Sequence, residues 1–117
     1  MKKEIVINDK KIGFNTEPYI IAELSGNHKG DINRAIKLID AAVISGANAI
    51  KLQTYTADTL TIDSNRSEFL VKGGPWSGQK LYDLYKEAST PWEWHPIIFQ
   101  YAKQKKIHFF SSPFDDS

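Results

Sequence analysis

The sequence predicts an α/β fold: the first three strands of a (β/α)8 TIM barrel, preceded by an N-terminal β-hairpin and truncated after the third strand. Two short apolar runs flank a segment with helical spacing, which is typical of a strand–helix–strand unit and a parallel sheet. A third apolar run follows a second helical region. Because such barrels typically need about 250 residues, we expect these 117 residues to form only part of one. The alternative is a small, complete doubly wound sandwich.

The segment 1–16 alternates apolar and polar residues on either side of a polar turn, which predicts the hairpin. Residues 17–117 are assigned to the partial barrel. Its first strand is expected at residues 19–22, where a near-continuous apolar run predicts burial on both faces. Asp31 is a suitable N-cap for the helix that follows, and Gly46 stands where that helix should stop.

A second buried strand is predicted at residues 49–53 and a third at 107–111. Between them, residues of about 55–80 form a long polar connection, which we expect to be irregular and either functional or disordered. A short helix of residues 81–88 then precedes Thr90-Pro91-Trp92-Glu93, a predicted capping box. In the next helix, Pro96 is expected to loosen the first turn. The predicted core-facing residues of that helix are Trp94, Ile97, Ile98 and Tyr101.

Composition excludes several classes of function. Hydrophobic residues make up 41% and charged residues 25%, as in ordinary soluble domains. A net charge of +1 does not suggest nucleic acid or an anionic membrane as a partner. The absence of cysteine excludes disulfides, thiolate metal sites and cysteine nucleophiles. No apolar run is long enough to span a bilayer, and we expect a cytoplasmic protein.

Lys51 and Gln53 are expected to share one face of the second strand, because side chains alternate along a strand. The outer face of a barrel strand must be apolar to meet its helices. The two polar side chains should therefore point into the barrel near its carboxyl end, where barrel enzymes place their sites. An inward ammonium needs an anionic partner or ligand. A solvent-facing lysine on an edge strand is the alternative.

Glu23 closes the first strand, where a carboxylate suits general acid–base catalysis or substrate positioning. Its alternative role is a salt bridge to Lys51. Ser111 and Ser112 follow the third strand and suit phosphate binding, although a serine pair before proline is commonly only a turn.

The three histidines show no zinc-type spacing. His28 lies in the first loop and is interpreted as a surface residue, whereas His95 and His108 are interpreted as structural. Most of the aromatic residues are expected to pack in the core rather than to line a sugar pocket. These are Trp76, Tyr82, Tyr85, Trp92 and Trp94.

Three motifs, each ending a predicted strand, resemble those of the sialic acid synthase family. Residues 21–28 are similar to its I-A-E-x-x-x-N-H motif, residues 46–54 to G-A-x-x-x-K-x-Q-T, and residues 109–114 to F-x-S-[ST]-P-F. The stretch 72–95 is similar to the pseudaminic acid branch, with the N-acetylneuraminic and legionaminic acid branches as alternatives. A non-catalytic half-barrel that binds a sugar or a partner chain is the alternative from another class.

The resemblance implies a transferase that condenses phosphoenolpyruvate with an acetamido-deoxy-hexose aldehyde and releases phosphate. Carried over by position, Glu23 would be catalytic, and Lys51 and Ser112 would bind phosphoenolpyruvate. Supporting or substrate-binding roles would go to Asn27, His28, Gln53 and Tyr55.

The resemblance also implies a divalent metal, manganese or magnesium, with no ligands among these 117 residues. The full-length enzyme would be a homodimer. A fragment of about a third of such an enzyme is expected to be inactive alone.

Overall fold

The computed structural model describes residues 4–116, so the first three residues of the predicted hairpin region lie outside it. The described part of that region forms an antiparallel pair, as predicted. The elements in chain order are β1 (Glu4–Ile7), β2 (Lys10–Gly13), β3 (Ile21–Glu23), α1 (Ile32–Ile44), β4 (Ala49–Thr54), α2 (Ala57–Leu60), the 3-10 turn η1 (Ser67–Phe69), α3 (Leu81–Ala88), α4 (Trp94–Gln104) and β5 (His108–Pro113). The division of the chain at residue 16 stays a prediction.

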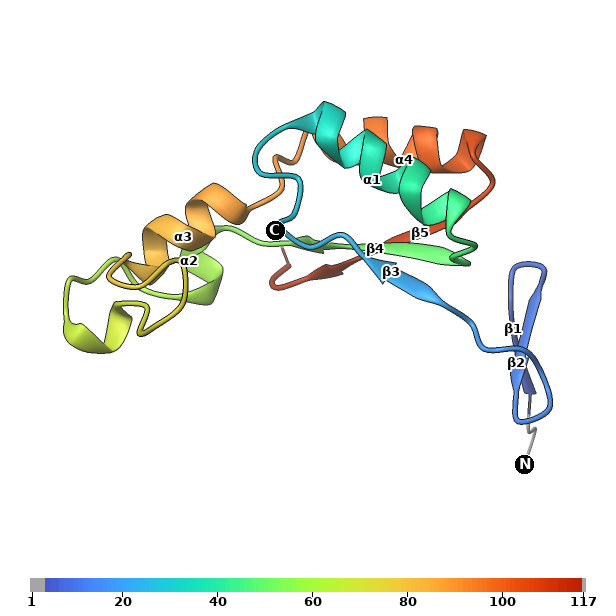
Figure 1. The fold of residues 1–117 in the computed structure, drawn as a ribbon, viewed down its shortest axis with the longest axis horizontal. Coiled ribbons are helices and arrows are strands. Elements are labelled where there is room, and N and C mark those ends of the chain that lie inside the picture. Colours follow the sequence, from blue (N-terminus) through green and yellow to red (C-terminus); the bar gives the residue numbers. More distant parts are fainter. Residues whose placement is uncertain (1–3, 117) are drawn as a thin grey trace.

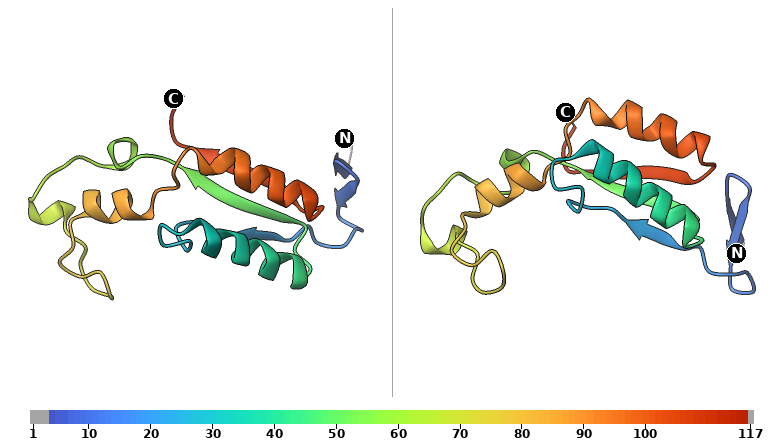
Figure 2. Two further views of the ribbon diagram at one scale, coloured as in Figure 1. Left: turned by 90° about the horizontal axis from the view of Figure 1, so that it is seen from above. Right: turned by 45° about the horizontal axis from the view of Figure 1, so that its top comes forward.

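The second sheet contains three parallel strands in the order β3-β4-β5. Helices α1 and α4 lie side by side over the same face of this sheet, and its other face is open (Figure 1, Figure 2). A doubly wound fold places helices on both faces, whereas a barrel keeps them all outside the strands. The arrangement is therefore that of consecutive β/α units of a barrel, and the described residues do not close one.

The core lies between the sheet and the two helices. Ile50 and Leu52 of β4 are completely buried against Ile39 of α1 and Ile98 of α4. Burying an aliphatic side chain of this size contributes about 1.5–3 kcal/mol. The alternation of β4 thus leaves Lys51 and Gln53 on the open face, as the sequence predicts.

Helix α1 begins and ends at the predicted signals. The Asp31 carboxylate accepts a hydrogen bond from the backbone N–H of Asn33 at 2.8 Å. Gly46 follows the last turn with a φ of 82°, a left-handed conformation that glycine adopts without strain.

The predicted capping box of α4 is wrong. The helix begins at Trp94, and its N-cap residue, Glu93, makes no side-chain capping hydrogen bond. Thr90 is instead buried, with its hydroxyl beside the ring of His28. A single-sequence pattern cannot reveal this partner, because it lies 62 positions away in the chain.

The loosened first turn predicted for α4 is confirmed. The backbone N–H groups of Trp94 and His95 donate to carbonyls only three residues earlier. Pro96 has no N–H with which to continue the ladder. Within the predicted core-facing set, Ile98 is buried and Trp94 and Tyr101 pack against the core, but Ile97 is half exposed.

The prediction that the first strand is buried on both faces is wrong. Strand β3 has three residues, and Ile20 and Ile21 are 52% and 47% exposed. Burial on both faces requires cover on both sides of the sheet. Among the described residues, β3 has one neighbouring strand and helices on one face only.

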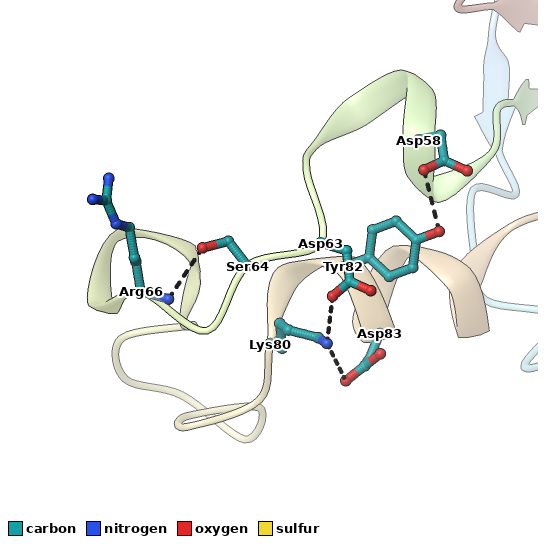
Figure 3. A network of polar contacts seen from close by, with 7 residues as sticks. All are labelled: Asp58, Asp63, Ser64, Arg66, Lys80, Tyr82 and Asp83. Atoms are coloured by element: carbon teal, nitrogen blue, oxygen red, sulfur yellow. Dashed lines mark hydrogen bonds and ion pairs between the residues drawn. The ribbon is translucent and has the colours of Figure 1, made fainter.

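The connection between β4 and α4 is more ordered than predicted. Residues 56–89, here called the arm, contain α2, η1 and α3 and extend beyond the carboxyl ends of the strands (Figure 1). The Lys80 ammonium lies 2.6 Å from the Asp63 carboxylate and 3.8 Å from the Asp83 carboxylate (Figure 3). The Tyr82 hydroxyl donates to the Asp58 carboxylate at 3.2 Å. These polar contacts join the two sides of the arm.

Gly26 sets how closely the first βα loop approaches the arm. A Cβ atom at this position would lie 3.0 Å from the Cβ of Ala88 and 3.2 Å from its carbonyl oxygen. We expect Gly26→Ala to lower the free energy of unfolding by about 1–3 kcal/mol, because the loop and α3 must move apart. Urea unfolding of the 117-residue chain measures the loss. Ala88→Gly should recover part of it in the double variant, and a Gly26→Ala chain as stable as its parent would contradict the close approach.

Candidate active site

Strand register brings four of the predicted site residues to the open face of the sheet. Glu23 pairs with Lys51 across β3 and β4, and Gln53 pairs with Ser112 across β4 and β5. Paired residues of parallel strands point to the same side, and side chains alternate along each strand. Since Leu52 is buried under the helices, these four side chains occupy the opposite face.

Glu23 and Lys51 form an ion pair, with 2.7 Å between the Oε2 and Nζ atoms. Both side chains remain partly exposed on the open face. An ammonium group carries three N–H donors, so the bond to Glu23 leaves donors for an anionic ligand. The salt bridge is therefore present and is compatible with a binding role for Lys51.

Ser25 joins this site, although the sequence interpretation did not single it out. Its backbone N–H donates to Glu23 Oε1 at 3.2 Å, and its hydroxyl donates to Gln53 Oε1 at 3.4 Å. Its φ is 50°, which is uncommon for a residue other than glycine. The available signal was its place in the turn that follows a strand ending in Glu23.

The serine pair is divided between the two faces of the sheet. Ser112 pairs with Gln53 on the open face, whereas Ser111 pairs with Leu52 on the helix face. The Ser111 hydroxyl contacts the Thr54 hydroxyl at 2.5 Å. Register thus leaves Ser112, rather than Ser111, in a position to meet a ligand on the open face.

Asn27 is exposed, and its side chain donates to the carbonyl of Leu24 at 3.0 Å. Together with Glu23 it lines a largely apolar groove of about 340 Å³ at the β3 edge. The supporting role of Asn27 stays a prediction.

His28 does not lie on the surface, and that interpretation is wrong. The residue is completely buried. Its Nδ1 accepts from the backbone N–H of Gly30 at 3.0 Å, so the neutral ring carries its hydrogen on Nε2, which lies 3.2 Å from the Thr90 hydroxyl. The ring also packs edge-on against Trp94 at a centroid distance of 5.2 Å. These contacts attach the first loop to the start of α4.

Burial lowers the pKa of the His28 imidazole below its ordinary value of 6.5. Below that pH the unfolded chain gains a proton that the folded chain excludes, so stability should fall as pH drops from 6.5 towards the lowered pKa. The limiting slope for one proton is about 1.4 kcal/mol per pH unit. Urea unfolding of the 117-residue chain at a series of pH values measures the slope of the free energy of unfolding against pH. His28→Gln should remove this part of the slope, and an unchanged slope would contradict the assignment.

Tyr55 connects the ends of the strands to the arm. It is 6% exposed. Its ring packs edge-on against the rings of Phe114 and Tyr85, at centroid distances of 5.5 Å and 6.2 Å. Burial raises the pKa of its phenol, with a smaller contribution from Tyr85. Its packing role is clear from these contacts, and a substrate-binding role stays a prediction.

Residues 4–116 contain no group of three or more histidine, cysteine, aspartate or glutamate side chains suited to a metal ion. The three histidines are engaged separately, with His95 bound to Thr54, and His108 to Tyr19 and Asp9. A divalent metal therefore does not fit the side chains present in this part of the chain. In the same residues, no helix is long and apolar enough to cross a membrane.

Comparisons with known proteins agree with this architecture. A profile of the NeuB family matches residues 38–117. Pseudaminic acid synthase of Campylobacter jejuni subsp. jejuni is 53% identical over 103 residues, which make up 86% of this chain and 30% of that protein. The Helicobacter pylori pseudaminic acid synthase is 45% identical over 97 residues, or 83% of this chain and 28% of that protein.

A crystal structure of N-acetylneuraminic acid (sialic acid) synthetase from Leptospira borgpetersenii serovar Hardjo-bovis, in complex with citrate, has a TM-score of 0.76 and 33% identity. The match covers 96% of this chain and 34% of that one, which confirms the partial-barrel prediction. The chain spans about 30% of the length of the curated relatives named above. On the family profile and these relatives together, the chain belongs to the NeuB family.

Proposed function

We propose that this chain forms the phosphoenolpyruvate-binding wall of a nonulosonic acid synthase. The observation that carries the proposal is the Lys51–Glu23 pair, at 2.7 Å, on the open face of a parallel sheet in a NeuB-family chain. Lys51 supplies positive charge towards the carboxyl end of the strands, where barrel enzymes bind their substrates. Ser112 and Gln53 add a hydroxyl and an amide on the same face.

In the proposed reaction, the methylene carbon of phosphoenolpyruvate attacks the aldehyde carbon of an acetamido-deoxy sugar. Water adds to the resulting oxocarbenium carbon, and phosphate leaves as its C–O bond breaks. Lys51 and Ser112 hold the phosphate and carboxylate of phosphoenolpyruvate through charge-assisted hydrogen bonds. Glu23, oriented by Lys51 and by the N–H of Ser25, acts beside the reacting carbon and positions the water.

Pseudaminic acid is the proposed product. Identity to the two pseudaminic acid synthases is higher than to the N-acetylneuraminic acid synthetase. The arm shares residues 72–89 with the stretch 72–95 that resembles the pseudaminic branch, and the arm is proposed to cover the sugar. N-Acetylneuraminic and legionaminic acids are the alternative products.

Manganese or magnesium is the proposed metal of the complete enzyme, and its ligands are proposed to come from residues other than those described here. A divalent metal would act as a Lewis acid towards the sugar aldehyde. Because the described side chains do not fit it, none of the roles given above depends on it. The complete enzyme is further proposed to be a homodimer in the cytoplasm.

A chimera tests the proposal. In it, the present chain replaces the matched segment of the Campylobacter jejuni pseudaminic acid synthase. We expect phosphate release that requires both phosphoenolpyruvate and the acetamido sugar precursor of pseudaminic acid, with kcat/KM within about tenfold of the natural enzyme, or about 1.4 kcal/mol. The precursors of N-acetylneuraminic and legionaminic acids serve as competitors for the product assignment.

A folded chimera that releases no phosphate would contradict the synthase function and favour a non-catalytic half-barrel. Faster turnover with either competing sugar would contradict the pseudaminic assignment alone. Circular dichroism and gel filtration of the chimera establish that it is folded.

A further inference from the structure

We propose that Ser111, Thr54 and His95 form a directed hydrogen-bond chain that positions the ligand-binding ends of β4 and β5, a role that rests on the function proposed above. None of the three side chains is assigned to binding or catalysis. All lie on the helix face of the sheet, behind the open face that carries Gln53 and Ser112. They are therefore positioning residues.

The contacts form a continuous chain from one strand to the next and on to the helix. The Ser111 hydroxyl of β5 lies 2.5 Å from the Thr54 hydroxyl of β4, which lies 2.7 Å from His95 Nε2 in α4. His95 Nδ1 lies 3.1 Å from the backbone carbonyl oxygen of Trp92. All three side chains are partly shielded from solvent.

The backbone carbonyl fixes the direction of the chain. A carbonyl oxygen can only accept, so Nδ1 of His95 carries the hydrogen. In the neutral ring Nε2 then accepts, and the Thr54 hydroxyl must donate to it. The Thr54 oxygen in turn accepts from the Ser111 hydroxyl. Each hydroxyl has one hydrogen, so every link depends on the one before it.

The consequence for the site follows from strand alternation. Thr54 is adjacent to Gln53, and Ser111 is adjacent to Ser112, and neighbours in a strand point to opposite faces. Anchoring Thr54 and Ser111 to α4 therefore fixes the orientation of both strand ends and the direction of the two open-face side chains. Within the loosened first turn of α4, both the ring Nδ1 and the backbone N–H of His95 contact the Trp92 carbonyl, at 3.1 Å each, which fixes the ring relative to its own helix.

Kinetics of the chimera test the positioning role. Thr54→Val keeps the shape of the side chain but removes the hydroxyl. We expect it to raise the KM for phosphoenolpyruvate about tenfold, with kcat changed about threefold or less, because Gln53 and Ser112 are proposed to bind the substrate and not to take part in the chemical step. Thr54→Ser keeps the hydroxyl and should restore the KM. Ser45→Ala removes an exposed hydroxyl at the far end of α1 and should change neither constant.

Nitrogen-15 NMR of the 117-residue chain with labelled histidine provides a readout that needs no activity. We expect the His95 ring to be the Nδ1–H tautomer, with His95→Gln identifying its signals. An Nε2–H tautomer of His95 would overturn the proposed direction of the hydrogen bonds. An unchanged KM in Thr54→Val, or no rescue by Thr54→Ser, would overturn the proposed positioning role. An inactive unsubstituted chimera would instead overturn the proposed function. The tautomer of His95 would then be the remaining test of the hydrogen-bond chain.

Discussion

Replacing Lys51 with alanine in the chimera is expected to lower kcat/KM for phosphoenolpyruvate by about 100-fold or more. A loss of that size corresponds to about 2.7 kcal/mol of transition-state stabilisation. The substitution removes the ammonium group and also leaves the Glu23 carboxylate, now without its partner at 2.7 Å, facing an anionic substrate. Loss of attraction and gain of repulsion act in the same direction. Steady-state phosphate release measures the effect.

Lys37→Ala is the matched control, because Lys37 is an exposed lysine on α1. It should leave kcat/KM unchanged within about twofold, since a solvated surface charge contributes little. Stability should be nearly the same in both variants, because Lys51 is not part of the core. A Lys51→Ala chimera that turns over at the parental rate would remove the main support for the proposed site.

Leu52→Ala, one position further along β4, is expected to have the opposite profile. The side chain is completely buried between the sheet and the helices. Truncation of such a residue costs about 2–5 kcal/mol, through lost burial and the cavity left behind. Urea unfolding of the 117-residue chain, followed by tryptophan fluorescence, should show this loss. The KM of the corresponding folded chimera should change much less than that of Lys51→Ala.

Ile44→Ala provides the control for this second result. Ile44 is also an aliphatic residue, but it is 85% exposed at the end of α1, so its truncation should change the free energy of unfolding by at most about 0.5 kcal/mol. Equal losses in Leu52→Ala and Ile44→Ala would mean that the helices do not cover β4 as described.

The two faces of β4 could be predicted from the sequence because alternation is a local property. Residues 50–53 read apolar, charged, apolar, polar, and a strand places these on opposite sides whatever surrounds it. The same reasoning overstated the burial of Ile20 and Ile21. Their exposure depends on what lies beside β3, and an apolar run carries no information about neighbouring strands.

Partners distant in the chain account for the other errors. Thr90 matches a capping pattern, yet its hydroxyl lies beside the ring of His28. Two favourable arrangements compete for one side chain, and packing of the first loop on α4 decides between them. Ser25 was missed for a related reason, since its hydroxyl matters only once Gln53 comes within 3.4 Å. By contrast, the placement of Glu23, Lys51 and Ser112 near the carboxyl ends of neighbouring strands could be predicted, because these ends lie at the same edge of a parallel sheet. Their roles in binding and catalysis stay predictions.

Successive side chains of β4 and β5 point to opposite faces of the sheet, and this makes the segment unusually sensitive to changes in chain length. Deleting one residue between the end of α1 and Lys51 would shift the strand by one position and exchange its faces. The ammonium group would then enter the apolar core, and Leu52 would take its place opposite Glu23. A substitution of Lys51 removes the charge on the open face, and a substitution of Leu52 removes apolar packing against the helices. A deletion removes both together. Natural variation in this segment should therefore occur by replacement and not by insertion or deletion.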